Sequence, residues 1–227
     1  MRKLSSLFFL TVSLTMASTV VYQTPTGSVS GGQSVSATAS ITTNADGTIS
    51  VTLTNLFANP TSAAQLLSDL YFTLDVAPGS ALSTTTTPTA SLIDLFGDST
   101  VGVAIDPWTL TSSGKVIHLD SLPGDPDQTI IGPGPYTNAN SSLTGDPHNP
   151  LINQSATFSF AVSGVTASTN ITAATFSFGT VTGADVVGEV CSTDCGSTTQ
   201  ATPEPTSMFL VGGGMLFAGC YRRFRRG

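Results

Sequence analysis

Two neighbouring segments of the chain, 34–42 and 48–54, alternate apolar and polar residues one by one. A period of two places every second side chain on the same face of a strand, whereas a helix would scatter such residues around its axis. The tetrapeptide between them, Asn-Ala-Asp-Gly at 44–47, has the composition of a hairpin turn. The two segments therefore predict a β-hairpin with one buried face. Its inward residues are Val35, Ala37, Ala39, Ile41, Ile49, Val51 and Leu53.

The same period recurs later in the chain, with turn-forming residues between the alternating segments. The segment 63–68 could form one helical turn, and no segment has an amphipathic helical pattern. Many short strands predict an all-β fold, an antiparallel β-sandwich, with an open β-barrel as the alternative. At 227 residues we expect one main domain. The further inward residues are Leu70, Phe72, Leu74, Val76, Phe158, Phe160 and Val162, and the segment 171–178 alternates on both faces.

The stretch 101–150 has the least regular pattern and is rich in proline, glycine and aspartate. The triplet Val101, Val103 and Ile105 alternates at its start, and Val116, Ile117 and Leu119 alternate loosely further on. So long a stretch inside a compact domain predicts either a functional loop or a loosely ordered insertion.

The N-terminus has the parts of a secretory signal peptide. A basic dipeptide starts the chain, 4–16 is apolar, and small residues around Ala17 suit cleavage. We expect a signal peptide over 1–17, which the Sec translocon reads and signal peptidase cuts after Ala17. The exported domain then runs from 18 to 199.

The segment 200–227 combines three elements. Pro203, Glu204 and Pro205 form a rigid extended tripeptide, because proline fixes φ and disfavours helix in the preceding residue. The apolar run within 206–221 contains three consecutive glycines, which disfavour a soluble helix but are frequent in membrane helices, and we expect one transmembrane helix there. A basic cluster that sets membrane topology follows. It consists of Arg222, Arg223, Arg225 and Arg226.

The order of these three elements resembles the PEP-CTERM sorting signal of Gram-negative bacteria. The resemblance covers 203–227. It implies that a membrane-embedded enzyme, exosortase, processes the protein near Pro203, Glu204 and Pro205 and passes it from the inner membrane to the cell surface or the medium. It also implies a link with exopolysaccharide and the biofilm matrix. The alternative is a permanent single-pass tail anchor that is not processed. Mutation of Glu204 to alanine would then leave the mass and the location of the protein unchanged.

Charges are segregated along the chain. Only Lys115 lies between the basic N-terminus and the arginine cluster, whereas thirteen of the fourteen acids precede the Pro-Glu-Pro motif. One lysine and thirteen acids give the exported domain a formal charge of −12 with histidine neutral. Such a surface lacks the basic patch that neutralises phosphates, which excludes nucleic acid as a partner.

Cys191 and Cys195 lie close together near the end of the exported domain. Exported chains meet an oxidising compartment, so we expect these cysteines to form a disulfide, with free thiols as the alternative. A metal site at the cysteines would need further ligands, and the chain has only two histidines, His118 and His148.

No catalytic set is evident, and we expect no enzyme activity. His118 is interpreted as a strand residue that faces solvent and His148 as a loop residue, and neither adjoins a nucleophile motif. Carboxylate pairs such as Asp125 and Asp127 would serve a glycosidase only if they converged across a cleft.

Calcium is the one cofactor that the composition suggests, because it prefers oxygen ligands in loops. No EF-hand or nonapeptide repeat is present, and the same residues form ordinary turns. Trp108 and Tyr136 could stack on a sugar ring, or Trp108 could pack in the core. The oxygen ligands considered are Asp120, Asp125, Asp127, Asp146, Asn138, Asn140 and Asn149.

These observations together favour a non-enzymatic protein of the cell surface or the extracellular matrix. One rival hypothesis is a carbohydrate- or calcium-binding adhesion module on the same anchor. Another is a secreted hydrolase of matrix polysaccharide, which would need two close carboxylates of unequal pKa in a cleft.

Overall fold

The computed structural model describes residues 17–79, 82–122, 128–145, 148–181, 183–192 and 195. Contacts divide the chain into two units, 1–195 and 196–227, and the second unit lies outside the described residues. The predicted signal peptide up to residue 16, the Pro-Glu-Pro tripeptide, the helix 206–221 and the arginine cluster also lie outside them and stay predictions. In the described part of the chain, no helix is both long and apolar enough to cross a membrane.

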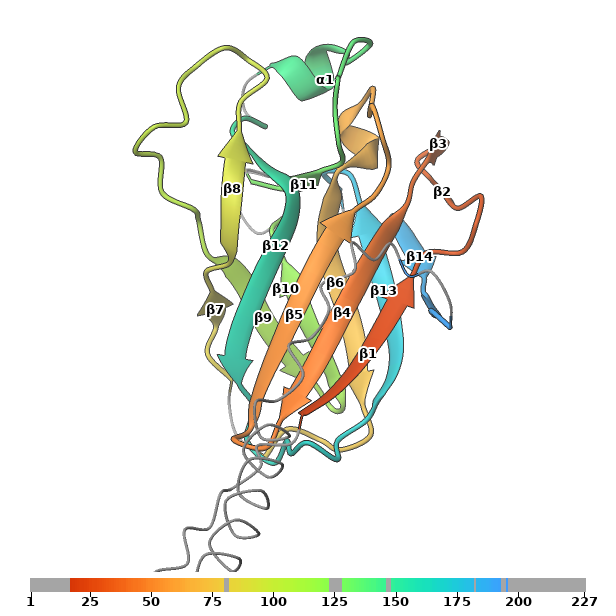
Figure 1. Cartoon of the computed structure of the whole chain (residues 1–227), viewed down its shortest axis with the longest axis vertical. Coiled ribbons are helices and arrows are strands. Elements are labelled where there is room, and N and C mark those ends of the chain that lie inside the picture. The colour runs from red at the N-terminus through yellow and green to blue at the C-terminus, as the bar shows by residue number, and fades with distance from the viewer. Residues whose placement is uncertain are drawn as a thin grey trace, which may run out of the picture. The chain divides into compact units, whose positions relative to one another are not determined.

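The described chain is built mostly from strands, which confirms the prediction of a β-rich domain (Figure 1). The segment 63–68 contributes one short 3₁₀ turn, η1 (Ala63–Gln65), and α1 (Ser141–Thr144) is the other helical element. The strands are β1 (Ala17–Gln23), β2 (Val29–Ser30), β3 (Gln33–Ser34), β4 (Ala37–Asn44), β5 (Thr48–Asn55), β6 (Leu67–Leu74), β7 (Thr85–Thr86), β8 (Thr89–Ile93), β9 (Trp108–Ser113), β10 (Val116–Asp120), β11 (Ile130–Ile131), β12 (Leu151–Ala161), β13 (Ile171–Phe178), β14 (Asp185–Val187) and β15 (Glu189–Val190).

Thirteen of these strands form one large mixed open sheet, whereas the sequence predicts an antiparallel sandwich. The main path is β15-β1-β4-β5-β12-β11-β6-β10-β9-β7, with β13 and β14 beside β6 and β8 beside β12. Figure 1 shows β1, β4, β5 and β12 in front of β6, β10 and β13. The difference arises at β11, where Ile130 pairs in parallel with Ile152 of β12 and antiparallel with Leu67 of β6. The hydrogen-bonded ladder therefore continues from the front layer into the rear layer.

The core lies between the two layers. Every inward residue that the alternation predicts for the hairpin is buried, as are Phe158, Phe160 and Val162 of the later segment. Trp108 of β9 packs on Phe158 of β12, with ring centroids 4.9 Å apart. The main core cluster includes Ile41, Ile49, Val51, Leu53, Leu70, Phe72, Leu74, Leu110, Ile117, Leu119, Ile152, Phe158 and Phe176.

The predicted hairpin is formed by β4 and β5, which pair from Ala37 opposite Asn55 to Thr43 opposite Ile49. The turn needs a positive φ, and Gly47 adopts φ +84°. Asp46 supports the turn next to it.

The Asp46 carboxylate accepts hydrogen bonds from the Thr48 hydroxyl at 2.7 Å and from the Thr48 backbone N–H at 3.0 Å. These bonds, the side-chain one first, lower the pKa of Asp46. Because the folded chain stabilises the ionised carboxylate, Asp46 adds to the stability of the fold at pH values above the ordinary aspartate pKa of about 3.9. This contribution is lost as the pH falls through the lower pKa that Asp46 has in the folded chain.

Replacing Asp46 with alanine should therefore lower the thermal midpoint slightly at neutral pH, and the deficit should shrink below about pH 4. Thermal unfolding of the two proteins across pH measures this difference. Asp46→Asn keeps an oxygen acceptor for Thr48 and is the control, which should stay near wild type at neutral pH. A deficit of Asp46→Ala that is the same at every pH would contradict the assignment.

The stretch 101–150 is more regular than its composition suggests, because it contains β9, β10, β11 and α1. Strand β10 is ordered by pairing with β6 on one side and β9 on the other. The alternating triplet at its start forms no strand, and Val101 and Val103 are 90% and 41% exposed. Pairing with a distant strand, which a local pattern does not reveal, therefore decides the structure here.

Buried Asn55 fixes the junction at β11. Its Nδ2 donates hydrogen bonds to the backbone oxygens of Gln65 (2.8 Å) and Ile130 (2.9 Å), and its Oδ1 accepts one from the Phe57 N–H (3.1 Å). Gly132 follows β11 directly and passes so close to Phe57 that a Cβ on it would overlap the carbonyl oxygen. The junction therefore requires glycine at 132.

Candidate functional site

The rear layer aligns a row of polar side chains on its outer face. In the strand register, Asp120 of β10 lies opposite Asp69 of β6. Asp69 also lies opposite Ser177 of β13, and Ser177 lies opposite Asp185 of β14. Their neighbours in sequence, such as Leu70, are core residues. Because successive side chains of a strand point to opposite faces, the row is turned away from the core.

His118 joins Asp69 and Asp120 on this face. Its Nε2 lies 3.5 Å from Asp69 Oδ2 and 3.9 Å from Asp120 Oδ2. One ligand atom from each of the three residues lies within 4.8 Å of the other two. The exposed fractions of the side chains are 3% for Asp69, 12% for Asp120 and 18% for His118. We call Asp69, His118 and Asp120 the acid–histidine cluster.

The neighbours of the cluster hold its side chains in place. The Tyr71 ring stacks on the imidazole of His118 with centroids 3.7 Å apart and planes 7° from parallel. The Leu122 N–H donates to Asp120 Oδ1 at 2.7 Å, while Asp120 Oδ2 faces His118. Asp69 Oδ1 and His118 Nε2 are buried and have no hydrogen-bond partner among the described residues.

The cluster concentrates negative charge. Burial is the main reason that the pKa of Asp120 is raised, and the negative charge of Asp69 raises it further. The hydrogen bond from the Leu122 N–H and the charge of His118 partly offset this increase in the pKa. Burial also raises the pKa of Tyr71, with the charge of Asp69 as the next cause. Carboxylates directly opposite each other on neighbouring strands repel one another, and removal from water adds to the cost.

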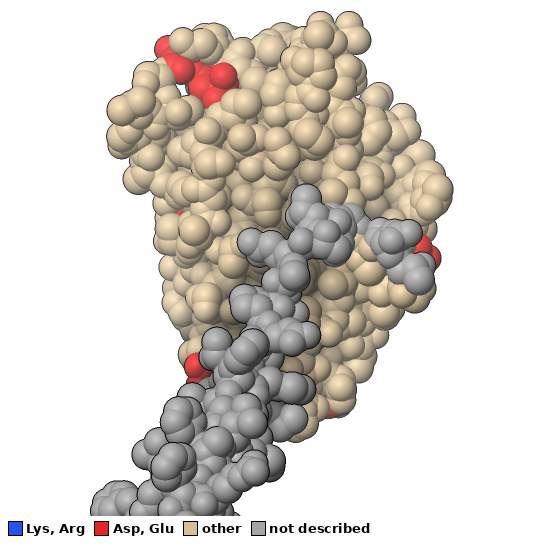
Figure 2. Space-filling model, in the orientation of Figure 1, with Lys and Arg blue, Asp and Glu red and all other residues tan. Residues whose placement is uncertain are grey.

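The exported domain has no arginine and one lysine to offset these acids. The lysine is Lys115, whose Nζ donates to the backbone oxygen of Asp75 at 2.6 Å. Figure 2 shows one face of the molecule on which charged side chains of either sign are few. In the described part of the chain, His118 is the basic side chain that lies beside Asp69 and Asp120.

The structure corrects the expectation for His118 and decides between the two alternatives for Trp108. His118 is largely covered and lies beside two carboxylates, whereas the sequence predicts a solvent-facing strand residue. Trp108 is 2% exposed and packs in the core, so it is not available to stack on a sugar. Tyr136 donates its hydroxyl to the backbone oxygen of Gly132 at 3.0 Å.

The structure describes four of the seven proposed calcium ligands, and Asp120, Asn140 and Asn149 have other contacts of their own. Asp125, Asp127 and Asp146 lie outside the described residues. Asp120 faces His118, and Asn140 instead caps α1 by accepting from the Ser142 N–H at 2.9 Å. Asn149 Nδ2 donates to the backbone oxygen of Leu143 at 2.7 Å. His148 precedes β12 in a connecting segment.

Sequence reasoning did not single out Asp69. The only local signal is the spacing of His118 and Asp120, which places both on one face of β10. The partner across the strand pair depends on the register of β6 with β10, which joins segments about fifty residues apart in sequence.

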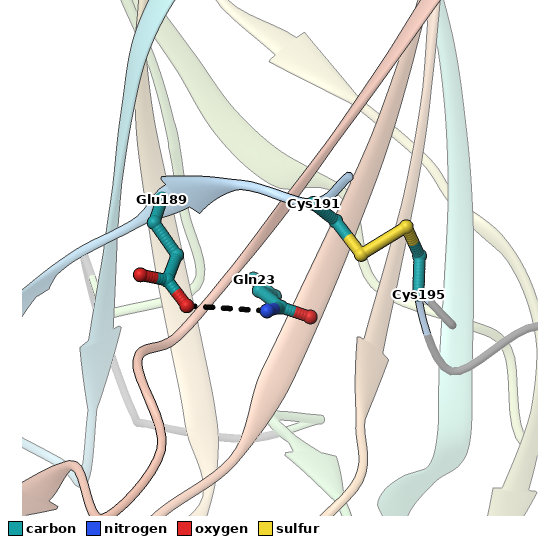
Figure 3. Close-up of a disulfide and its surroundings, with 4 residues drawn as sticks. All are labelled: Gln23, Glu189, Cys191 and Cys195. Atoms are coloured by element: carbon teal, nitrogen blue, oxygen red, sulfur yellow. Dashed lines mark hydrogen bonds between the residues drawn. A yellow bond between two sulfur atoms is a disulfide. The ribbon is translucent and has the colours of Figure 1, made fainter. Parts of the chain in front are cut away.

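A disulfide lies just after β15. Cys191 and Cys195 are joined by an S–S bond of 2.06 Å (Figure 3). The Cys191 N–H donates to the Val21 oxygen of β1 at 2.9 Å, and the adjacent Glu189 accepts a hydrogen bond from Gln23 Nε2 at 3.2 Å. The bridge therefore lies where the last strand pairs with the first.

A β domain is thus followed by a short, separate C-terminal unit. Residues 201–226 of that unit match the PEP-CTERM protein-sorting motif, as the order of tripeptide, apolar run and arginine cluster predicts. Proteins with this motif are exported and associated with the membrane or cell surface, and the motif implies processing by exosortase. Comparisons with curated proteins and with solved structures gave no match.

Proposed function

We propose that this chain is a non-enzymatic protein of the cell surface or extracellular matrix, and that its β domain is the cargo of the sorting motif. The helix 206–221 holds the precursor in the inner membrane, and exosortase acts near Pro203, Glu204 and Pro205. The β domain then reaches the exopolysaccharide matrix of a biofilm. The observation that carries this proposal is the sorting motif at 201–226.

The boundaries of the β domain support the role of cargo. Strand β1 pairs with β15, with Tyr22 opposite Val190, so the first and last strands lie side by side. Cleavage after Ala17 would remove only the first residue of β1. Both export signals can therefore be removed without loss of a core strand.

The acids of the rear layer support a non-enzymatic role. Asp69 and Asp120 are carboxylates that lie opposite each other on neighbouring strands, and the Asp69 side chain is 3% exposed. A glycosidase needs both carboxyls to reach the scissile bond of a sugar. With Trp108 in the core as well, neither the hydrolase nor the sugar-stacking hypothesis gains support.

The intact mass of the protein recovered from the cell surface and medium tests the proposal. We expect a mass that lacks the arginine cluster and ends near Pro205. Glu204→Ala should retain the full C-terminus and remain with the inner membrane, because exosortase is expected to read the tripeptide.

The matched control is Glu189→Ala, which removes the other glutamate of the chain and should leave processing unchanged. A surface protein whose mass still includes Arg222 to Gly227 would show that the tail is a lasting anchor. Normal processing of Glu204→Ala would show that Glu204 is not read.

A further inference from the structure

The acid–histidine cluster leaves one oxygen of a buried carboxylate without a hydrogen-bond partner. The Asp69 side chain is 3% exposed, and its Oδ1 has no hydrogen-bond partner among the described residues. Asp120 lies directly across the strand pair and adds a second carboxylate. Burying an ionised carboxylate is costly unless it is paired or binds a metal.

The positions of the three donors suit a metal ion. Donor atoms that surround an ion at about 2.1 Å with tetrahedral angles lie about 3.4 Å from one another. His118 Nε2 lies 3.5 Å from Asp69 Oδ2 and 3.9 Å from Asp120 Oδ2. Asp69 and Asp120 also offer one oxygen each within 4.8 Å of each other, so closure of the two aspartates around an ion would complete this spacing.

The surroundings of the donors also resemble those of a metal site. The Leu122 N–H bonds one oxygen of Asp120 while the other oxygen faces His118, and Tyr71 stacks on the imidazole. Such outer contacts orient ligands before the metal binds. We propose that Asp69, His118 and Asp120 bind a divalent transition-metal ion, with Zn²⁺ as the best match.

The donor types select this class of ion. Calcium takes six to eight oxygen ligands, whereas imidazole suits zinc and its neighbours among the transition metals. Three protein ligands leave a fourth position of a tetrahedral ion for water or for a donor group of a partner. The partial exposure of His118 and Asp120 leaves this side of the cluster accessible to solvent.

Titration of the full-length, tag-free protein with Zn²⁺ tests the proposal. The protein is kept in detergent, stripped of metal with a chelator, and carries Cys220→Ser so that the tail thiol does not bind zinc. We expect saturable binding of one Zn²⁺ per chain by calorimetry and a rise in the thermal midpoint. His118→Gln and Asp120→Asn should each weaken binding at least about 100-fold.

Matched variants separate a metal site from a structural cluster. His148→Gln and Asp98→Asn remove the other histidine and an acid outside the cluster, and they should bind Zn²⁺ like the parent protein. Asp69→Asn removes a buried charge, so without metal the thermal midpoint of this variant should equal or exceed that of the parent. Adding Zn²⁺ should raise the thermal midpoint of the variant far less than it raises that of the parent. Circular dichroism checks that each variant is folded.

Two results would overturn the proposal. If the folded parent protein shows no saturable Zn²⁺ binding, the three residues form a structural cluster and not a metal site. If Zn²⁺ binds but folded His118→Gln binds it equally well, the imidazole is not a ligand.

Discussion

Replacing Gly132 with alanine should lower the free energy of unfolding by about 4 kcal/mol or more, the largest effect that we expect from a single methyl group. A Cβ at this position would overlap the backbone oxygen of Phe57 and lie 2.9 Å from its carbonyl carbon. Neither backbone can move freely, because Asn55 ties this segment to Ile130 of β11. Denaturant unfolding of wild type and variant measures the loss.

Gly79→Ala is the control for the alanine substitution itself. The nearest atom to a Cβ on Gly79 is the Ser163 side-chain oxygen at 3.2 Å, which can rotate away. We expect a change below about 1 kcal/mol for this variant. Equal stability of the Gly132 and Gly79 variants would show that the β11 junction is not closely packed.

Replacing Phe158 with alanine should cost about 3–5 kcal/mol of the free energy of unfolding. Phe158 on β12 is fully buried and contacts Trp108 of β9, so it joins the front layer to the rear layer. Its loss would leave a cavity between the layers that the surrounding strands cannot close. The fluorescence of Trp108, the chain's one tryptophan, reports unfolding directly.

Phe96→Ala removes the same side chain from the surface and serves as the control. Phe96 is 54% exposed. Its variant should unfold within about 0.5 kcal/mol of wild type. If both phenylalanine variants lost the same stability, the core would not lie where the two layers meet.

The fold was predictable wherever one strand carries its own signal. Ile41 and Val51 lie in segments of strict alternation around a turn sequence, and both segments form the strands expected. Strand β11 has only two residues, and its Ile130 pairs with two distant strands. Its role in joining the layers depends on long-range pairing, so the single mixed sheet was not predictable from local pattern.

The acid–histidine cluster shows the same limit. The alternation around Ile117 and Leu119 indicates that His118 and Asp120 share a face, but it does not say what lies opposite. Only the register of β10 with β6 brings Asp69 to them. A burial estimate from residue type alone also places an aspartate at the surface, whereas Asp69 is 2% exposed.

The sequence by itself determined the sorting motif and the β-rich fold class, because each is a pattern of residues that are neighbours in the sequence. The motif at 201–226 is a linear order of proline, apolar residues and arginine, and strand alternation is a repeat of two. The tertiary structure alone decided that Trp108 is core and that Asp69, His118 and Asp120 meet. These outcomes depend on which strands pair and in what register, and that is settled by packing across the whole domain.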